Sequence, residues 1–414
     1  MVFSLLRRRP APLLPEPVAR VVLAPPPEPG RQWTAAAGPA APETGGVITI
    51  DLAVIAGNWR SLANRAVPAA CAAVVKADAY GCGIEPVAAA LARSGCTTFF
   101  VAHLAEARRV RSVAGDAAVY VLNGIAPGSA ALFAEVDARP VIGTMSEWVE
   151  WEAFRVASGW RGLAALHFDT GMNRLGFTAA EAPVFTSRVK LPGHGIALVM
   201  SHLACADTPA HPLNARQIEA FRDLRYLFRG VPTSLANSSG IFLGPAAHCD
   251  LVRPGAALYG VNPVPGTRNL MEPVVTVRSR VVQIRVVTRA ETVGYGATFT
   301  AAGPSRIAIV SAGYADGYLR AVGNANLSPG GRPSARGPAC VVIGRHRCPL
   351  VGRVSMDLLA ADVTGVPDGE GRRGDDATLI GQGITVDDVA AWGGTIGYEV
   401  LTGLSRRFRR EWME

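Results

Sequence analysis

Lysine is scarce in this chain of 414 residues, and its scarcity directs attention to the two lysines present, Lys76 and Lys190. Lys76 follows the apolar run 69–75, where a charged amine is costly to bury unless it has a partner or a task. Partial burial lowers the pKa of a lysine and frees its amine for Schiff-base chemistry. A snorkelling or ion-paired lysine is the other interpretation of Lys76. Lys190 stands between a helical pattern and a turn, which predicts a solvated surface residue.

Short apolar runs alternate with helical patterns around Lys76, and this alternation predicts the scaffold that positions it. Apolar residues at helical spacing predict helices over 51–66, near 84–93 and over 103–113. The strand candidates are the apolar runs at 69–75, 97–101, 117–122, near 140, 163–168, 195–200, 234–236 and near 251. Strands that alternate with helices pair in parallel, and about eight of them predict a closed (β/α)8 barrel with catalytic groups at the strand ends. An open doubly wound sheet is the alternative, but its usual glycine-rich turn after the first strand is absent.

The composition changes twice along the chain, which predicts three regions. Residues 1–46 are rich in Pro and Ala and lack periodicity, so we expect a flexible tail, with a cleaved targeting peptide as a second interpretation. Residues 47–270 carry the barrel pattern. Val274–Val287 alternates with a period of two, and many glycines follow, so 271–414 is predicted to be a mostly β domain. The predicted fold class is therefore α/β, a TIM-like (β/α)8 barrel followed by a C-terminal mostly β domain.

Composition and charge exclude several classes of protein. The chain is 49% hydrophobic and 18% charged, which is typical of a globular protein. Its net charge of +8 comes from arginines that are spread along the chain, so no nucleic-acid partner is predicted. No apolar run reaches the length of a membrane-spanning helix, and no membrane partner is expected. The seven cysteines form no C-x-x-C pair, which indicates reduced thiols in a cytoplasmic protein. Cys340, His346 and Cys348 lack a fourth ligand at suitable spacing, so they are interpreted as strand and turn residues and no metal is predicted.

The sequence around Lys76, Val-Val-Lys-Ala-Asp-Ala-Tyr-Gly at 74–81, resembles the pyridoxal-phosphate attachment motif of the alanine racemases. Other motifs of that family follow in its order over roughly 47–410. They lie at 169–176, 201–202, 236–238, 253–260, 294–296, 312–317, 351–357 and 397–399. The ordered series argues against a chance resemblance. It implies a fold-type III enzyme that interconverts L-alanine and D-alanine, most commonly to supply D-alanine for peptidoglycan.

The resemblance implies two bases on opposite faces of the substrate. Lys76 would hold pyridoxal phosphate as a Schiff base and, once displaced, act on the D-alanine face. Tyr295, contributed across the interface of a homodimer, would act on the L-alanine face. A phenol needs help to act as a base, and His202 is the expected hydrogen-bond partner, with Arg253 behind it. Arg253 would also face the pyridine nitrogen, where a guanidinium gives a weaker electron sink than a carboxylate would.

The same resemblance implies the remaining binding residues. The cofactor phosphate would be held by backbone N–H groups and hydroxyls of Tyr80, Asn237, Ser238, Gly255, Ala256 and Tyr398. The substrate carboxylate would be held by Arg174 and the backbone N–H of Met356, and the entry channel would be lined by Asp207, Tyr314 and Arg320. One position departs from the family pattern. Many members carry a carbamylated lysine seven residues before Arg174, whereas this chain has His167, which forms no stable equivalent.

Other interpretations stay open. A racemase of broader substrate range would carry the same motifs. A D-threonine aldolase-like lyase on the same barrel would need a metal beside the cofactor, so metal dependence separates the two. A non-catalytic cofactor-binding protein on a similar barrel would lack the second domain, and the motifs around Tyr295 and Met356 argue against it.

Overall fold

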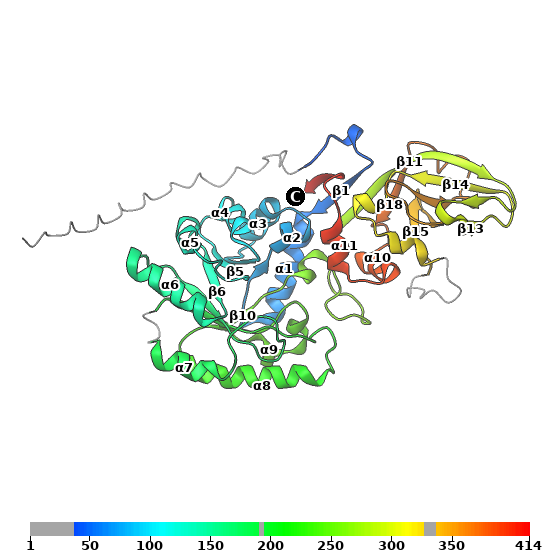
Figure 1. Ribbon diagram of the computed structural model, residues 1–414. Coiled ribbons are helices and arrows are strands. Elements are labelled where there is room, and N and C mark those ends of the chain that lie inside the picture. The colour runs from blue at the N-terminus through cyan, green and yellow to red at the C-terminus, as the bar shows by residue number, and fades with distance from the viewer. Residues whose placement is uncertain (1–36, 190–193, 327–336) are drawn as a thin grey trace, which may run out of the picture.

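The computed structural model describes residues 37–189, 194–326 and 337–414. Figure 1 shows two lobes, with most segments coloured from blue to green in a barrel and those from yellow to red, together with the blue β1, in a mostly β domain beside it. Lys190 and most of the predicted tail, residues 1–36, lie outside the described residues. Within the described ranges, no helix combines the length and the apolar character that crossing a bilayer requires.

The barrel is built from parallel strands, as the alternating pattern predicts. Seven strands form one sheet in the order β3 (Ala73–Val74), β4 (Thr98–Val101), β5 (Ala118–Val121), β6 (Arg139–Ile142), β7 (Ala164–His167), β8 (Ile196–Met200) and β9 (Thr233–Ser234). β10 (Leu251–Val252) pairs in parallel with β2 (Ala70–Cys71), which continues into β3. Backbone hydrogen bonds from Asp250 to Thr233 and from Arg253 to Ala236 join β10 to the β9 side and close the ring. Each of the eight predicted runs overlaps a barrel strand, although β9 shares only Ser234 with the run 234–236.

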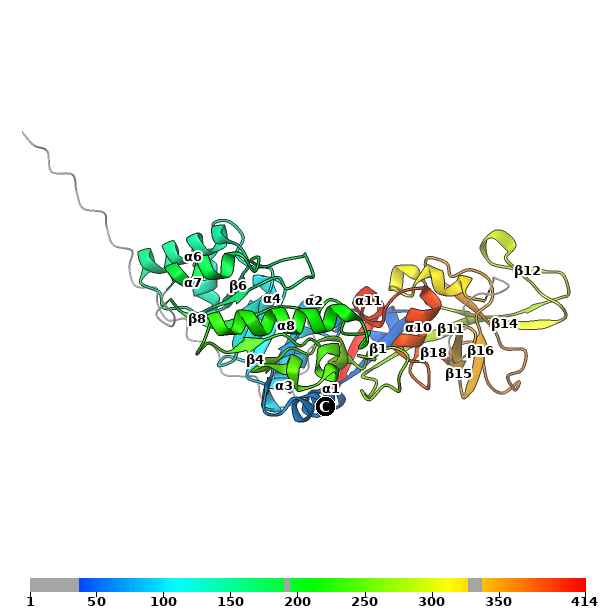
Figure 2. The ribbon, with the colours of Figure 1, turned by 90° about the horizontal axis from the view of Figure 1, so that it is seen from below.

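Helices cover the outside of the barrel (Figure 2). They are α1 (Leu52–Ala66), α3 (Ile84–Arg93), α4 (Leu104–Arg111), α5 (Ala130–Val136), α6 (Met145–Ser158), α7 (Glu181–Arg188), α8 (Pro212–Leu227) and the short α9 (Pro245–His248). α1 starts where the Asp51 carboxylate accepts the N–H of Val54, a side-chain cap for an otherwise unpaired donor. Its buried face follows the predicted helical spacing and includes Ile55, Trp59 and Leu62.

Side chains fill the barrel interior, so the structure is a packed core rather than a pore. Alternate residues of the strands point inward and form one apolar cluster, consisting of Ala72, Val74, Phe100, Tyr120, Val141, Ala165, Leu198, Met200 and Leu251. The rings of Phe100 and Tyr120 stack with centroids 4.9 Å apart. This apolar cluster supports the site that lies at the C-terminal ends of the same strands.

The second lobe is dominated by strands. One path of its main sheet runs β16 (His346–Pro349), β15 (Cys340–Ile343), β18 (Asp376–Ile380), β11 (Val275–Val287), β1 (Gly46–Asp51) and β19 (Arg409–Met413). β14 (Ser305–Val310) and β17 (Leu359–Asp362) extend the sheet, and β12 (Thr292–Val293) with β13 (Phe299–Thr300) forms a hairpin. Two helices, α10 (Val386–Gly393) and α11 (Gly397–Gly403), complete the lobe.

β1 connects the two lobes, because it pairs with β11 and β19 of the second lobe before the chain enters α1 of the barrel. Its alternating burial matches a strand in a sheet. Residues 46–51 thus lie in the second sheet although they precede the barrel in sequence. The exact domain limits, 47–270 and 271–414, stay a prediction.

Candidate active site

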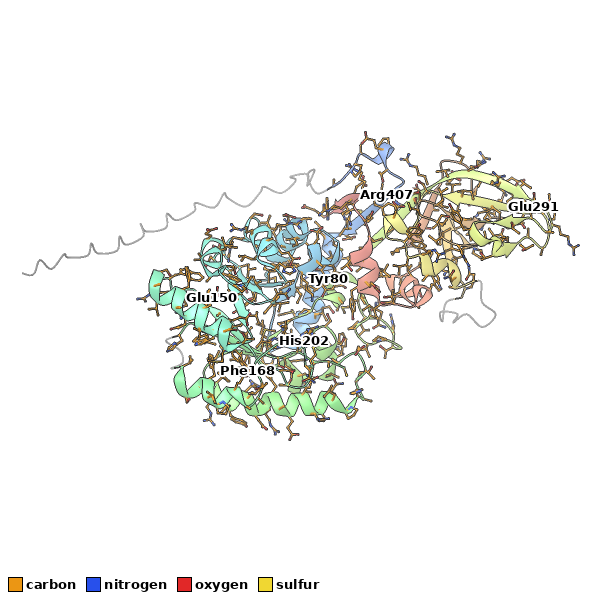
Figure 3. All side chains as sticks on the ribbon, viewed as in Figure 1. Tyr80, Glu150, Phe168, His202, Glu291 and Arg407 are labelled. Carbon is orange, nitrogen blue, oxygen red and sulfur yellow. The ribbon has the colours of Figure 1, made fainter. Side chains whose placement is uncertain are left out.

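The C-terminal ends of the barrel strands surround a cavity of about 840 Å³. Helices α10 and α11 of the second lobe complete its wall. Among the residues predicted from the sequence, this cavity is lined by Lys76, Tyr80, His167, Arg174, His202, Asp207, Asn237, Ser238, Arg253, Gly255, Ala256 and Tyr398. Figure 3 labels two of them, Tyr80 and His202, in the barrel lobe, with Glu291 at the far end of the second lobe. The fold thus brings together residues up to 322 positions apart in sequence (398 − 76).

Lys76 begins a turn of unusual hand, α2 (Lys76–Tyr80), directly after β3. Ala77, Asp78, Ala79 and Tyr80 have φ between 53° and 56°, and Gly81 has φ of 83°. Four consecutive side-chain-bearing residues in the left-handed region cost roughly 1–2 kcal/mol each. Such strain persists only where surrounding contacts fix the backbone, and it is typical of functional sites. The turn directs both Lys76 and Tyr80 into the cavity.

The amine of Lys76 is half-buried, and its surroundings favour the neutral form. Burial lowers the pKa of Lys76, the positive charge of Arg174 lowers it further, and Glu106 opposes the shift. A lysine with a lowered pKa is a better nucleophile and a better base near neutral pH. The structure therefore gives Lys76 the properties that its place after an apolar run predicts.

Hydroxyls and backbone amides of Tyr80, Ser238 and Gly255 lie close together in the cavity lining. The Ser238 hydroxyl accepts the backbone N–H of Gly255 at 2.9 Å and that of Ala257 at 3.2 Å. A Cβ on residue 255 would collide with the Tyr80 hydroxyl, so glycine is required there for close approach. Burial raises the pKa of Tyr80, which keeps its phenol protonated as a donor. Hydroxyls and backbone amides of this kind suit a phosphate group.

Arg253 and His202 form a directed pair deep in the barrel. The Arg253 guanidinium is buried and donates to the Ser234 hydroxyl, to the Ser201 carbonyl at 2.6 Å and to His202 Nδ1 at 3.4 Å. Because an arginine donates only, Nδ1 of His202 must accept and its proton must sit on Nε2. Burial and the charge of Arg253 hold the pKa of His202 well below its ordinary value. His202 is therefore neutral and presents an Nε2–H donor.

His167, at the end of β7, lies against the same charges. Burial lowers the pKa of His167 to about 4, and the neighbouring Arg253 and Arg174 add to the shift. A neutral imidazole thus stands at the position where the motif resemblance implies a carbamylated lysine. Arg174 follows in a loop built by the Asp169 carboxylate, which accepts the N–H groups of Gly171 and Met172 at 2.9 Å each.

Tyr295 and Met356 do not reach the cavity of their own chain. Tyr295 lies in the second lobe in the short helix η4 (Tyr295–Ala297), and 73% of its side chain is exposed. Met356 is 53% exposed in a loop where its carbonyl accepts the N–H of Ala315 at 3.0 Å. Tyr314 and Arg320 also lie outside the cavity lining, whereas Asp207 is part of it. The predicted site residues therefore divide into a cavity group and a surface group.

Comparison with known proteins decides the family. A model described as the alanine racemase N-terminal domain matches residues 50–263, and one described as the C-terminal domain matches 274–412. The chain belongs to the alanine racemase family. An alanine racemase of Methylobacterium nodulans is 50% identical over 89% of this chain and 96% of that protein. A form from Agrobacterium fabrum named biosynthetic is 44% identical over 88% of this chain and 93% of its own length. A form from the same organism named catabolic is 41% identical over 89% of this chain and 92% of its own length.

A solved structure agrees with this assignment. The alanine racemase of Bartonella henselae, crystallised with covalently bound pyridoxal phosphate, superposes with a TM-score of 0.82 at 34% identity, over 91% of this chain and 100% of that one. The racemase described here is thus a pyridoxal-phosphate-dependent isomerase of alanine. Its cavity fits that cofactor, because a half-buried amine, a set of neutral donors and a buried guanidinium face one volume.

Sequence reasoning missed the residues that hold the Lys76 turn. Glu106 of α4 accepts the N–H of Ala77 at 2.6 Å, and Arg109 of the same helix contacts the Asp78 carboxylate at 2.6 Å. Asp78 belongs to the Lys76 motif, but no motif or spacing in the sequence points to Glu106 or Arg109. Only the folded barrel brings α4 beside the turn.

Proposed function

We propose that this racemase works with two bases, Lys76 and Tyr295, in composite sites that each combine the cavity of one subunit with the surface group of another. The observation that carries the proposal is the mismatch between the two groups. The cavity holds a neutral His202 that offers an Nε2–H, while Tyr295 of the same chain stands exposed on the second lobe. A second copy of the chain would bring its own Tyr295 to that donor.

The cavity residues divide the work among them. Pyridoxal phosphate, when bound, supplies an electron sink that makes the α-proton of alanine acidic. Lys76 anchors the cofactor and then moves the proton on the D-alanine face. Tyr80, Asn237, Ser238, the backbone N–H groups of Gly255 and Ala256, and Tyr398 hold the phosphate. Arg174 and the backbone N–H of Met356 orient the substrate carboxylate.

Arg253 serves two purposes in this proposal. Burial lowers its pKa to about 10, which still leaves the guanidinium charged near neutral pH. Arg253 would lie beside the pyridine nitrogen of the bound cofactor, and because a guanidinium does not give up a full proton, the electron sink would stay moderate and return of the proton to Cα would be favoured. Its contact with His202 Nδ1 fixes the tautomer whose Nε2–H stabilises the ionised form of Tyr295.

A mixed dimer tests the composite site. Lys76→Ala and Tyr295→Phe each remove one base, so each homodimer should lose activity. When the two variants are combined in one dimer, one of its sites carries both defects and the other carries neither. We therefore expect purified mixed dimers to recover about half of the wild-type turnover. Mixed dimers as inactive as the parents would show that both bases act within one chain and would overturn the proposal.

We further propose that the enzyme is cytoplasmic and supplies D-alanine for peptidoglycan. All seven cysteines, which lie within the described residues, are unpaired, as is typical of a reducing compartment. Deleting the gene should make growth depend on added D-alanine. A catabolic enzyme would instead be needed only for growth on alanine as a carbon source.

Substrate range is the open alternative, because a broader racemase would have the same cavity residues. Turnover of L-alanine and D-alanine should exceed that of serine and threonine under the same conditions. Comparable turnover of all three would favour the broad-specificity enzyme, and metal-dependent cleavage of threonine would favour the aldolase-like lyase.

A further inference from the structure

The end of the chain carries arginines at 406, 407, 409 and 410, to which the site described above gives no role. Two of them reach the turn that follows Lys76. The Arg406 guanidinium lies 3.1 Å from the Asp78 carboxylate, and Arg410 Nε donates to the Gly81 carbonyl at 3.0 Å. Arg410 is buried and also donates to the carbonyls of residues 404 and 405, so it ties the turn to the C-terminal segment.

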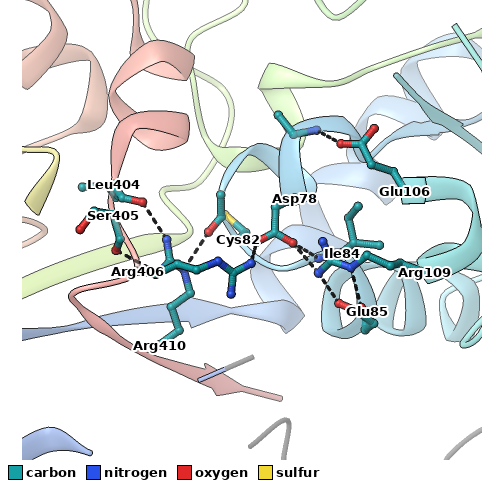
Figure 4. Close-up of polar contacts among 12 residues, drawn as sticks. Asp78, Cys82, Ile84, Glu85, Glu106, Arg109, Leu404, Ser405, Arg406 and Arg410 are labelled. Atoms are coloured by element: carbon teal, nitrogen blue, oxygen red, sulfur yellow. Dashed lines mark hydrogen bonds and ion pairs between the residues drawn. The ribbon is translucent and has the colours of Figure 1, made fainter. Parts of the chain in front are cut away.

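The barrel holds the other side of the same turn (Figure 4). Arg109 of α4 contacts Asp78 and Glu85 at 2.6 Å each. Glu106, one helical turn earlier, accepts the N–H of Ala77 at 2.6 Å. The Asp78 carboxylate thus lies between a guanidinium of the barrel and one of the C-terminal segment. Charge-assisted contacts of this kind are stronger and more directional than neutral hydrogen bonds.

The position of this carboxylate matters because the turn has a disfavoured hand. Asp78 is the second of four successive non-glycine residues with φ above 50°. Lys76 stands at one end of the turn and Tyr80 at the other, and both line the cavity. If the turn relaxed toward the right-handed form, Lys76 and Tyr80 would no longer point into the same volume.

We propose that Asp78, Arg109 and Arg406 form a clamp that positions Lys76 and Tyr80 for the cofactor. None of the three lines the cavity, so they are positioning residues rather than catalytic ones. The C-terminal segment thereby supports the cofactor site from outside. This inference rests on the proposed roles of Lys76 and Tyr80.

Asp78→Asn and Arg406→Gln test the clamp in the full-length enzyme. Asp78→Asn keeps the amide oxygen that can accept the N–H of Ile84, as Asp78 Oδ1 does at 3.2 Å, but it removes the charge. We measure the dissociation constant of pyridoxal phosphate by titration into enzyme stripped of cofactor, together with the melting temperature of both forms. We expect affinity to fall about tenfold for Asp78→Asn and about threefold for Arg406→Gln, whose side chain is 62% exposed. The melting temperature should fall more with cofactor than without it.

Two matched variants control for charge and for general destabilisation. Arg409→Gln removes the same charge from the same segment, but Arg409 contacts Glu411 and the Pro39 carbonyl instead of the turn. It should bind cofactor as the wild type does. Arg406→Lys keeps a cation opposite Asp78 and should recover most of the affinity, because Arg406 makes a single contact with that carboxylate.

The proposal is overturned if Asp78→Asn and Arg406→Gln bind cofactor normally, or if Arg409→Gln weakens binding as much as Arg406→Gln does. Equal loss of melting temperature with and without cofactor, at unchanged affinity, would also overturn it. If Asp78→Asn fails to fold, the exposed Arg406 still decides the matter. A Lys76→Ala variant that keeps the visible absorbance of lysine-bound cofactor would instead refute the role of Lys76, so the two failures are distinguishable.

Discussion

The mouth of the barrel and the exposed loops of the second lobe carry the two proposed bases in opposite surroundings. Lys76 is half-buried beside Arg174 and Glu106, on a turn held from two sides. Tyr295 is 73% exposed and lies between Gly294 and Gly296, both with positive φ. The contacts around Lys76 all come from its own chain. The Tyr295 side chain instead points outward from the second lobe. Under the proposed mechanism, the surroundings of Lys76 come from its own chain, whereas those of Tyr295 would come from a second copy of the chain.

Lys76→Ala should have the largest effect on the barrel side of this comparison. Without the amine, the cofactor loses its covalent anchor and the D-alanine face loses its base. We expect racemisation to fall at least about a thousandfold, because general-base and covalent contributions are removed together. Absorbance spectra should show that the visible band of lysine-bound cofactor is lost. A variant that keeps this band and half of its turnover would remove Lys76 from the mechanism.

Tyr295→Phe should cause a comparable loss of turnover through the exposed loops of the second lobe. Removal of one hydroxyl would take away the proposed second base, so turnover should fall about 10²- to 10⁴-fold in both directions, since each direction needs both bases. The visible absorbance and the cofactor affinity should stay as in the wild type, because the residues proposed to hold the cofactor all line the cavity and Tyr295 is not among them. A large loss of cofactor affinity would show that the two regions are not separable in this way.

The same comparison explains how much the sequence alone could predict. Helices such as α1 and all eight barrel strands follow from apolar periodicity, since burial on one face leaves a regular pattern. The cavity residues follow from their motifs. The left-handed turn does not, because Ala77, Asp78 and Ala79 ordinarily favour right-handed conformations and only outside contacts reverse them.

Contacts between residues far apart in the sequence could not be predicted either. No strand is predicted over residues 46–51, and the structure pairs them, as β1, with β11 and β19 of the second lobe. The ion pair between Asp78 and Arg406 joins positions 328 residues apart, where no local pattern can connect them. The motif around Tyr295 marks a functional residue, yet its separation from the cavity is visible only in the fold.

Arg407→Gln should affect only the exposed loops of the second lobe, and its effect on catalysis should be smaller than that of Lys76→Ala or Tyr295→Phe. Arg407 contacts Asp316 at 3.2 Å and Asp357 at 2.9 Å, and Asp357 follows Met356 directly. The pairs are partly exposed, so we expect the KM for alanine to rise about three- to fivefold as the Met356 loop loosens. Cofactor titration should give an unchanged dissociation constant, the opposite of the pattern for Arg406→Gln. If Arg406→Gln and Arg407→Gln changed the KM and the cofactor dissociation constant in the same way, the C-terminal segment would affect both regions together.

His167→Gln should have the smallest effect of these variants. Its effect on the pH dependence of unfolding tests whether solvent is excluded from the mouth of the barrel. The pKa of His167 is lowered from 6.5 to about 4 by burial, with Arg253 and Arg174 adding to the shift. Between pH 4 and 6.5 the unfolded chain therefore holds a proton at this residue that the folded chain lacks. Its contribution makes the free energy of unfolding rise with pH across this window, fall as the pH is lowered, and stay constant above it.

Substitution by glutamine removes this proton difference, so the slope of the unfolding free energy against pH should decrease by up to about 1.4 kcal/mol per pH unit. Urea unfolding at several pH values and one protein concentration measures it, because the stability of the proposed dimer would depend on concentration. His103→Gln, which alters an exposed histidine at the start of α4, is the matched control. An unchanged slope in His167→Gln would mean that water reaches this end of β7, and the mouth of the barrel would then resemble the exposed loops more than its burial indicates.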